Sequence, residues 1–247
     1  MAALYAASRG VTDHSMTPHP RLIAIGGGGF THETDPDMEN FLLAQLPTER
    51  PRIGFVRTAS RDEAAKIARF HARFAGVCAS HTHLPMAADA VQAQAWLDDL
   101  DIVYVGGGNT LHLVAHWREQ GIDQVMKAAA RRGVLMAGVS AGANVWFEQA
   151  LSDSGGRGLA PTTGSGLIVG SCCPHYSSEP QRQNAFMACI SCGDLTDGIA
   201  IDDGVAVLFD GHGSMMAFSA RAGAGAYAIR RSGNTAVCTP LLPAIKP

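Results

Sequence analysis

Short apolar runs without polar alternation recur along the first two thirds of the chain, at residues 22–25, 53–56, 102–105 and 134–137. Such runs are typical of strands that are buried on both faces of a parallel sheet. Between them, apolar residues recur at helical spacing, as in Ile67, Phe70 and Phe74. The alternation from residue 21 to about 150 predicts an α/β fold, a doubly wound and mostly parallel sheet with helices on both faces.

The pattern changes near the C-terminus. Short β-like runs separated by glycine-containing turns follow one another at residues 199–201, 205–209, 215–218 and 226–229. We expect antiparallel strands there that extend or flank the same sheet. Because no linker rich in Pro, Gly and Ser divides the chain, we predict one domain over residues 21–232, a frayed tail over 1–20 and a C-terminal tail over 233–247.

Charge and hydropathy exclude several classes of partner. The 247 residues carry 19 Lys and Arg against 22 Asp and Glu, so no basic field exists to attract nucleic acid or an acidic membrane. The apolar runs stop after four or five residues, whereas a membrane-spanning helix needs roughly 20. Arg9, Asp13 and His14 interrupt the Ala-rich start before a secretory apolar region forms. We therefore expect a cytoplasmic protein without nucleic-acid or membrane partners.

The six cysteines are sparse for a chain of this length and predict reduced thiols rather than a disulfide framework. Cys189 and Cys192 have redox-motif spacing, and Cys172, Cys173 and His175 suggest a zinc site. However, a second CxxC pair is absent, and cysteine is often simply buried. We expect no metal and no cofactor.

Glycine clusters follow three of the predicted strands, at residues 26–29, 106–108 and 138–142. The carboxyl ends of parallel strands are where such sheets carry their chemistry. The sequence of the first cluster disfavours a dinucleotide-binding loop, because the G-x-G-x-x-G spacing requires glycine at position 31, where Thr31 stands. We interpret it as a tight turn that lets backbone or substrate approach closely.

The third cluster, from Gly138 to Gly142, matches the G-x-S-x-G nucleophile elbow at a strand-to-helix junction. Glycines beside Ser140 remove the bulk that would obstruct a strained turn, and the next backbone N–H points toward the space above the hydroxyl. A helix running from about Ala143 would add its positive end to an oxyanion there. Small residues at such a junction also arise for packing alone, so the pentapeptide is not decisive by itself.

A serine nucleophile needs a base, and the base needs an orienting carboxylate. Of the ten histidines, His175 stands out because it follows a strand-like run at 168–170 and precedes a helix start at Glu179 and Pro180. The other histidines fall in the tail, the first loop, predicted helices, an edge strand or a late turn. The alternative for His175 is that it only caps the following helix.

These residues together resemble the peptidase E family of serine peptidases, whose relatives include cyanophycinase. The matching segments are residues 25–30, 56–60, 104–110, 137–143 and 173–176. A GGGNT loop followed about thirty residues later by GxSAG distinguishes this family from α/β-hydrolases, which also place the histidine last. The resemblance implies a flavodoxin-like fold similar to class I glutamine amidotransferases. An amidotransferase would carry Cys at position 140, where Ser140 stands.

The resemblance also implies the catalytic residues. They are Ser140 as nucleophile, His175 as base and an acid from residues 198–204. We expect that acid to be Asp203, where relatives often carry Glu. Asp202 is the first alternative and Asp153 a weaker one. Gly107 and Ala141 are expected to supply backbone N–H groups to an oxyanion hole.

Substrate recognition is less constrained. We expect Gly28, Arg57, Asn109 and Glu179 to bind substrate. The name-giving peptidase E cleaves dipeptides with N-terminal Asp, which requires a cation, and Arg57, Arg157 and Arg182 are the candidates. Glu179 suits a substrate amino group instead.

The expected function is that of a serine exopeptidase acting on short peptides, Asp-X dipeptides among them, as a monomer or homodimer. An esterase or amidase using Ser140 and a cyanophycinase-like peptidase are the alternatives. A non-enzymatic binding module is disfavoured by the joint presence of serine, histidine and acid.

Overall fold

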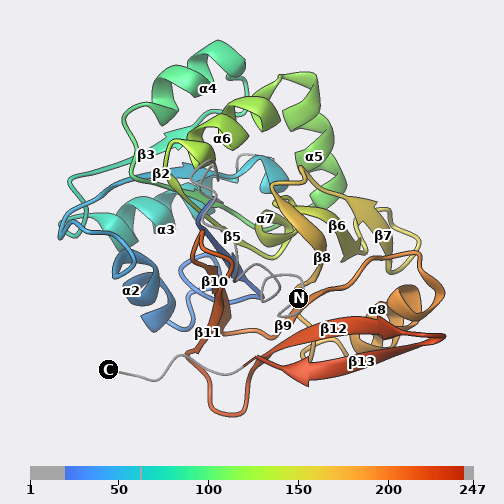
Figure 1. Cartoon of the computed structure of the whole chain (residues 1–247). Coiled ribbons are helices and arrows are strands. Elements are labelled where there is room, and N and C mark those ends of the chain that lie inside the picture. Colours follow the sequence, from blue (N-terminus) through green and yellow to red (C-terminus); the bar gives the residue numbers. More distant parts are fainter. Residues whose placement is uncertain (1–19, 62, 242–247) are drawn as a thin grey trace, which may run out of the picture.

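The computed structural model describes residues 20–61 and 63–241, whose strands form two sheets (Figure 1). The first sheet has the order β11-β10-β1-β5-β4-β2-β3. Its strands from β1 to β3 in that order run parallel, whereas β10 pairs antiparallel with β1 and β11 pairs antiparallel with β10. The strands are β1 (Leu22–Ile25), β2 (Arg52–Val56), β3 (Ser80–Leu84), β4 (Ile102–Val105), β5 (Leu135–Val139), β10 (Val205–Phe209) and β11 (Met215–Ser219).

The second sheet has the order β13-β12-β9-β8-β6-β7. β6, β8 and β9 are parallel, while the strands outside them pair antiparallel. Its strands are β6 (Phe147–Ser152), β7 (Ala160–Thr163), β8 (Ile168–Cys173), β9 (Gly198–Ile201), β12 (Ala226–Ser232) and β13 (Thr235–Pro240).

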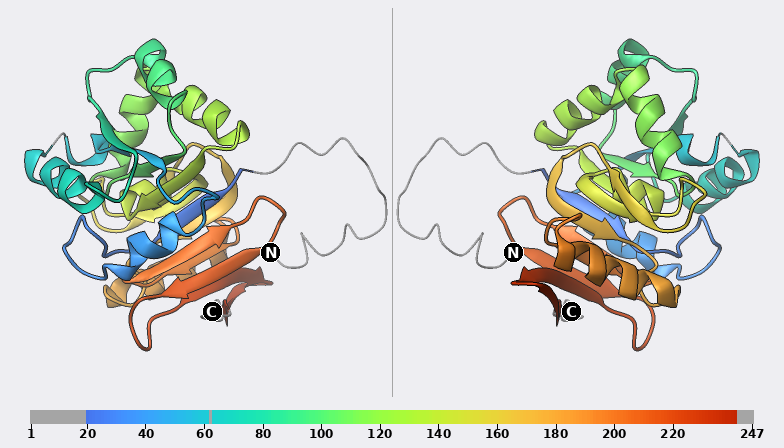
Figure 2. Two further views of the ribbon diagram at one scale, coloured as in Figure 1. Left: turned by 90° about the vertical axis from the view of Figure 1, so that its left-hand side faces the viewer. Right: turned by 90° about the vertical axis from the view of Figure 1, so that its right-hand side faces the viewer.

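The helices are distributed over separate faces. In Figures 1 and 2, α4, α5 and α6 lie together on one side of the molecule, and α8 lies against β12 and β13 at the opposite end. None of the helices in the described ranges is long and apolar enough to cross a membrane. They are α2 (Asp37–Leu43), the 3-10 helix η1 (Thr58–Ser60), α3 (Ala64–Phe74), α4 (Ala90–Leu97), α5 (Thr110–Glu119), α6 (Ile122–Arg131), α7 (Ala141–Asn144) and α8 (Pro180–Cys192).

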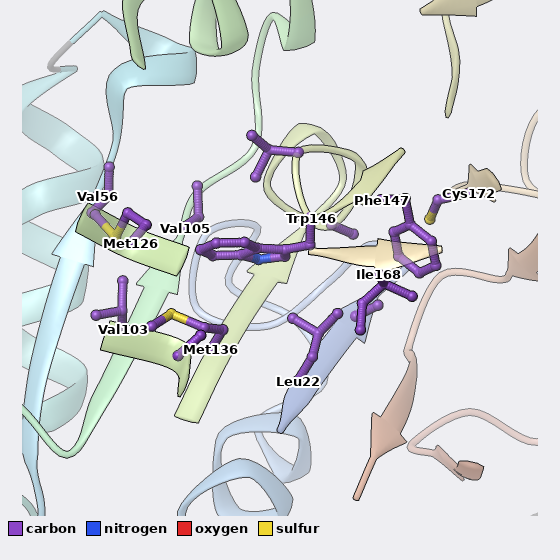
Figure 3. Packing of buried hydrophobic residues seen from close by; sticks show 14 of the residues in the cluster. Leu22, Val56, Val103, Val105, Met126, Met136, Trp146, Phe147, Ile168 and Cys172 are labelled. Carbon is purple, nitrogen blue, oxygen red and sulfur yellow. The ribbon is translucent and has the colours of Figure 1, made fainter. Parts of the chain in front are cut away.

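Alternating side chains of the first sheet enter different cores. Leu22 of β1 belongs to the cluster on the side of α4 to α6, and its neighbour Ile23 belongs to the aromatic-rich cluster on the side of α2 and α3. Figure 3 shows Trp146 at the centre of the first cluster, with Met136 of the first sheet on one side and Ile168 of the second sheet on the other. One continuous core therefore joins the two sheets.

The structure confirms the mostly parallel α/β fold with antiparallel strands near the C-terminus. The late strands divide between the sheets, however, because β10 and β11 extend the first sheet whereas β9, β12 and β13 belong to the second. An apolar run identifies a strand but not its partner, which lies far away in sequence.

The structure also places a strand, β13, inside the segment expected to be a C-terminal tail. Most side chains of β13 are exposed, so no apolar pattern marks the strand, and backbone pairing with β12 holds it in place. The N-terminal tail expected over residues 1–20 lies, except for Pro20, outside the described residues.

Candidate active site

Ser140 directly follows β5 and occupies a sharp turn with φ of 57° and ψ of −116°. The two glycines of the pentapeptide make that turn sterically feasible. A Cβ on Gly138 would overlap the carbonyl of Gly142, and a Cβ on Gly142 would overlap the carbonyl of Val105. Backbone therefore packs directly on backbone beneath the serine, which only glycine permits.

The helix after Ser140 is α7, which begins at Ala141 rather than near Ala143 and ends at Asn144. A helix this short adds little macrodipole, so its contribution is the individual N–H groups of its first turn. The Ala141 N–H has no acceptor inside the helix, because the first N–H groups of a helix lack one. On the other side of the serine, a Cβ on Gly107 would lie 3.6 Å from Ser140 Oγ. Gly107 thus lies close to Ser140, and Ala141 directly follows it.

His175 follows β8 and reaches across to the first sheet. Its φ is 56°, and the backbone around it is held by the Tyr176 N–H, which donates to Ile201 O at 3.1 Å, and by the Glu179 N–H, which donates to His175 O at 3.2 Å. This left-handed conformation directs the imidazole at the elbow. The distance from His175 Nε2 to Ser140 Oγ is 2.8 Å.

Asp203 lies between β9 and β10, where the chain passes from the second sheet to the first. Its Oδ1 is 2.6 Å from His175 Nδ1. The hydrogen bond from His175 holds the pKa of the Asp203 carboxyl below its usual range, against the opposing effect of burial. An ionised carboxylate only accepts hydrogen bonds, so His175 Nδ1 carries the proton and Nε2 is free to accept from Ser140.

The two alternative acids lie elsewhere. Asp202 points to the opposite side of the extended segment, where its Oδ2 accepts from the Gly225 N–H at 2.9 Å. Asp153 has an exposed side chain, and its Oδ1 lies 3.7 Å from Arg182 Nη2. Of the three carboxylates considered, Asp203 is the one that the structure brings to His175.

Ser140 and His175 open into a cavity of about 290 Å³. Its other lining residues come from the loops after β1, β4, β6 and β8, with one from α3 and one from α8. They are Thr31, His32, Lys66, Gly107, Gly108, Asp153, Glu179 and Arg182.

Charged groups on one wall of this cavity are already paired. The Arg182 side chain is 5% exposed, and its Nε donates to Glu179 Oε2 at 2.6 Å. Arg182 also faces Asp153, so one cation stands between two carboxylates. Across the cavity, Lys66 Nζ lies 3.0 Å from Glu63 Oε2. The wall formed by Asp153, Glu179 and Arg182 therefore carries an excess negative charge.

Three residues expected to bind substrate are not among those that line this cavity. Gly28 has φ of 94° and packs against the carboxylate of Asp35, so its role in the fold is a turn. Arg57 is 4% exposed and directly precedes η1. Asn109 caps α5, because its side-chain oxygen accepts from the His112 N–H at 2.8 Å. Arg157 is exposed in a turn after β6.

Four of the lining residues are not among those that the sequence predicts for the site, namely Thr31, His32, Lys66 and Gly108. Thr31 and His32 follow the first glycine cluster after Phe30, and their nearness to the end of a strand is the signal that could have found them. Lys66 lies in the first turn of α3, and only the packing of that helix decides which of its faces meets the site.

The cysteines do not assemble around this site. All six are free thiols; Cys172 and Cys173 are buried, and Cys189 and Cys192 lie in the last turn of α8. Burial raises the pKa of Cys173 to about 12. Within residues 20–61 and 63–241, no group of three or more His, Cys, Asp or Glu side chains is arranged to hold a metal ion.

Comparisons with known proteins place the chain in a family. Residues 22–216 match the sequence model of peptidase family S51. The chain is 39% identical over 214 residues to the uncharacterized peptidase YgaJ of Bacillus subtilis, a match that covers 85% of this chain and 91% of that protein. It is 46% identical to peptidase E of Citrobacter koseri over 66 residues, which is 27% of this chain and 28% of that protein.

Solved structures show the same fold. A putative peptidase E from Listeria monocytogenes superposes with a TM-score of 0.61 at 16% identity, covering 81% of this chain and 98% of that one. A peptidase from an acI-B1 actinobacterium superposes with a TM-score of 0.65 at 15% identity, covering 90% of this chain and 98% of that one. The resemblance to the peptidase E family that the motifs indicated is confirmed. The chain therefore belongs to peptidase family S51 and is a serine-type peptidase.

Proposed function

We propose that this chain is an exopeptidase that hydrolyses short peptides with a free amino terminus, using Ser140, His175 and Asp203 as its catalytic triad. The observation that carries the proposal is the unbroken hydrogen-bonded chain from Asp203 Oδ1 through His175 to Ser140 Oγ, with distances of 2.6 and 2.8 Å. A nucleophile bonded to a base that is itself oriented by an acid is the arrangement that serine catalysis needs.

In the first half of the reaction, Ser140 Oγ attacks the carbonyl carbon of the scissile bond while His175 Nε2 takes the hydroxyl proton. Asp203 stabilises the imidazolium that forms. The carbonyl oxygen becomes an oxyanion that accepts hydrogen bonds from the N–H groups of Gly107, which lies close to Ser140, and Ala141, which directly follows it. His175 then gives its proton to the leaving amine, the C–N bond breaks, and an ester on Ser140 remains.

In the second half, His175 Nε2 takes a proton from water, and the resulting hydroxide equivalent attacks the ester carbon. The C–O bond to Ser140 breaks, and the serine oxygen recovers the proton from His175. The products are a carboxylic acid and the restored enzyme. The proton transfer between Ser140 and His175 uses groups that lie within hydrogen-bond distance of one another.

The size of the cavity supports a short substrate. At about 290 Å³ it lies just below the range of roughly 300 to 1,000 Å³ in which small-molecule sites fall. Loops after several strands contribute to its walls. This space suits a di- or tripeptide better than a loop of a folded protein.

The charge distribution supports recognition of an amino terminus. Asp153 and Glu179 present two carboxylates, and Arg182 between them balances only one. A substrate ammonium group would neutralise the excess charge and form charge-assisted hydrogen bonds.

Preference for an N-terminal Asp has weaker support. The lining cations Lys66 and Arg182 each already pair with a carboxylate. A substrate side-chain carboxylate would have to compete with Glu63 or Glu179. We therefore base the proposal on the free amino terminus rather than on Asp-X dipeptides.

A dipeptide library with the purified protein tests the proposal. Free di- and tripeptides should be cleaved, and acetylation of their amino terminus should lower kcat/KM by on the order of 100-fold, because a partly desolvated charged contact is lost. Para-nitrophenyl acetate and the Asp-Arg polymer cyanophycin serve as the comparison substrates for the esterase and cyanophycinase alternatives. Equal rates on free peptides and acetylated peptides or intact proteins would overturn the exopeptidase assignment.

The expected cytoplasmic location remains part of this proposal. It is supported by the six cysteines, all of which are free in the structure.

A further inference from the structure

A bidentate ion pair joins two loops that are far apart in sequence. Arg221, after β11, donates from Nε to Asp35 Oδ1 at 2.8 Å and from Nη2 to Asp35 Oδ2 at 2.6 Å. The Asp35 side chain is 9% exposed, which is unusual for a carboxylate on a loop. The mechanism proposed above does not use either residue.

Two glycines accommodate this ion pair. A Cβ on Gly28 would overlap the Asp35 carboxylate, and a Cβ on Gly204 would lie 2.6 Å from Arg221 Cγ and 2.8 Å from its Nε. Both glycines have positive φ, of 94° and 73°. The Arg221 side chain therefore lies over the residue that immediately follows Asp203.

Arg221, packed against the residue next to Asp203, interacts electrostatically with the Asp203 carboxylate. Arg221 contributes to the low pKa of the Asp203 carboxyl, and Asp203 in turn contributes to the raised pKa of Arg221. The hydrogen bond that Asp203 must maintain for catalysis is the one that its Oδ1 accepts from the His175 Nδ1–H at 2.6 Å. A guanidinium with five donors would compete for the same oxygens if it were free to turn.

We propose that Asp35 is a positioning residue that retains the Arg221 guanidinium on its own carboxylate and so leaves Asp203 to His175. The inference rests on the proposed triad and adds to it a residue from the loop after β1. The Arg221 guanidinium binds both oxygens of the Asp35 carboxylate, so removal of that charge acts on the position of Arg221.

Asp35→Asn is the discriminating variant. Asp35 has φ of 52°, and asparagine tolerates this left-handed conformation, so the loop retains its backbone. The neutral amide removes the charge that holds Arg221. We expect kcat/KM for alanine p-nitroanilide, a chromogenic amide with a free amino terminus, to fall about tenfold, which is within the coupling range of contacting groups.

The second arm removes the competitor. Arg221→Gln should lower kcat/KM by less than about threefold, and the double variant Asp35→Asn/Arg221→Gln should recover to within about threefold of the wild type. A matched control is Asp98→Asn, which breaks the exposed Asp98–Arg132 pair at the ends of α4 and α6 and should leave kcat/KM unchanged. If the two single variants lose activity equally, or if the double variant is as slow as Asp35→Asn, the ion pair only braces the loops and the proposal is wrong.

A spectroscopic measurement separates this inference from the proposed function. The proton between His175 Nδ1 and Asp203 gives a downfield ¹H NMR signal that needs no substrate. We expect it to be lost in Asp35→Asn and retained in Arg221→Gln and in the double variant. Its retention in Asp35→Asn would overturn the inference even if Ser140 proves to be the nucleophile, whereas its loss there supports the inference whatever substrate the enzyme prefers.

Discussion

Ser140 and His175 are joined by a 2.8 Å contact, and both have the positive φ that side chains other than glycine rarely adopt, 57° and 56°. Such conformations cost on the order of 1 to 3 kcal/mol each and persist where surrounding contacts enforce them. Here the Ser140 N–H donates to Ile25 O at 3.0 Å, and the Tyr176 N–H beside His175 donates to Ile201 O at 3.1 Å. Each sheet thus holds one of the two residues in a strained turn that faces the other.

Ser140→Ala should lower kcat by roughly 1,000-fold or more, because loss of the nucleophile disables the triad as a unit. The measurement is steady-state hydrolysis of the best peptide from the library. The melting temperature should stay close to that of the wild type, since alanine is no bulkier than serine in the turn. A variant that retains most of its activity would exclude Ser140 as nucleophile.

Asp203→Asn should lower kcat by roughly 1,000-fold or more, whereas Asp202→Asn should change it little. An amide at position 203 can donate to His175 Nδ1, which then accepts, so the proton moves to Nε2 and the base is lost. An amide at position 202 keeps an oxygen for the Gly225 N–H. Measuring kcat of the two variants under the same conditions checks this prediction. A larger loss of kcat in Asp202→Asn would assign the triad acid to Asp202 instead.

Asp203 should also contribute to the pH dependence of stability. Its folded-state pKa is lowered, chiefly by the hydrogen bond from His175, so its contribution is present above the unfolded-state pKa of about 3.9 and is lost as pH falls through the folded-state value. We expect the difference in free energy of unfolding between the wild type and Asp203→Asn to be larger at pH 7 than at pH 3. Urea unfolding at both pH values measures it, and a difference that grows on acidification would contradict the prediction.

Glu179→Gln should lower kcat/KM on free dipeptides by about tenfold to 100-fold, because a charged hydrogen bond to the substrate amino group is lost. On amino-acetylated peptides, which lack that charge, the variant and the wild type should be equally slow. Glu119→Gln, at the end of α5, is the control carboxylate outside the cavity lining. An equal loss on both kinds of peptide would assign Glu179 to support of Arg182 rather than to the substrate.

Gly142→Ala should destabilise the fold by about 1 to 3 kcal/mol, because the added Cβ would overlap the Val105 carbonyl, and backbone cannot move aside cheaply. Gly155→Ala is the matched control, since its Cβ would meet only the Leu111 side chain at 3.7 Å. Thermal unfolding of both variants checks the prediction. Equal melting temperatures would show that the elbow has room for a methyl group.

The sequence by itself determined the parallel strands β1, β2, β4 and β5 of the first sheet and the position of the elbow, because both are local patterns. Continuous apolar runs are what strands buried on both faces require, and glycines at 138 and 142 are what a backbone-on-backbone turn requires. The sequence pattern also identified His175 as the base, since His175 follows a strand-like run and precedes a helix start.

Only the tertiary structure decided which side each neighbouring residue faces and which distant groups meet. Asp202 and Asp203 are adjacent, yet one turns to Gly225 and the other to His175, and the second sheet sets that direction. The late strands divide between two sheets, and Arg221 meets Asp35, because pairing partners separated by many residues leave no local pattern. Arg57 is likewise buried and lies outside the cavity lining. The burial of a side chain at a strand end depends on the elements packed above that end and not on the strand itself.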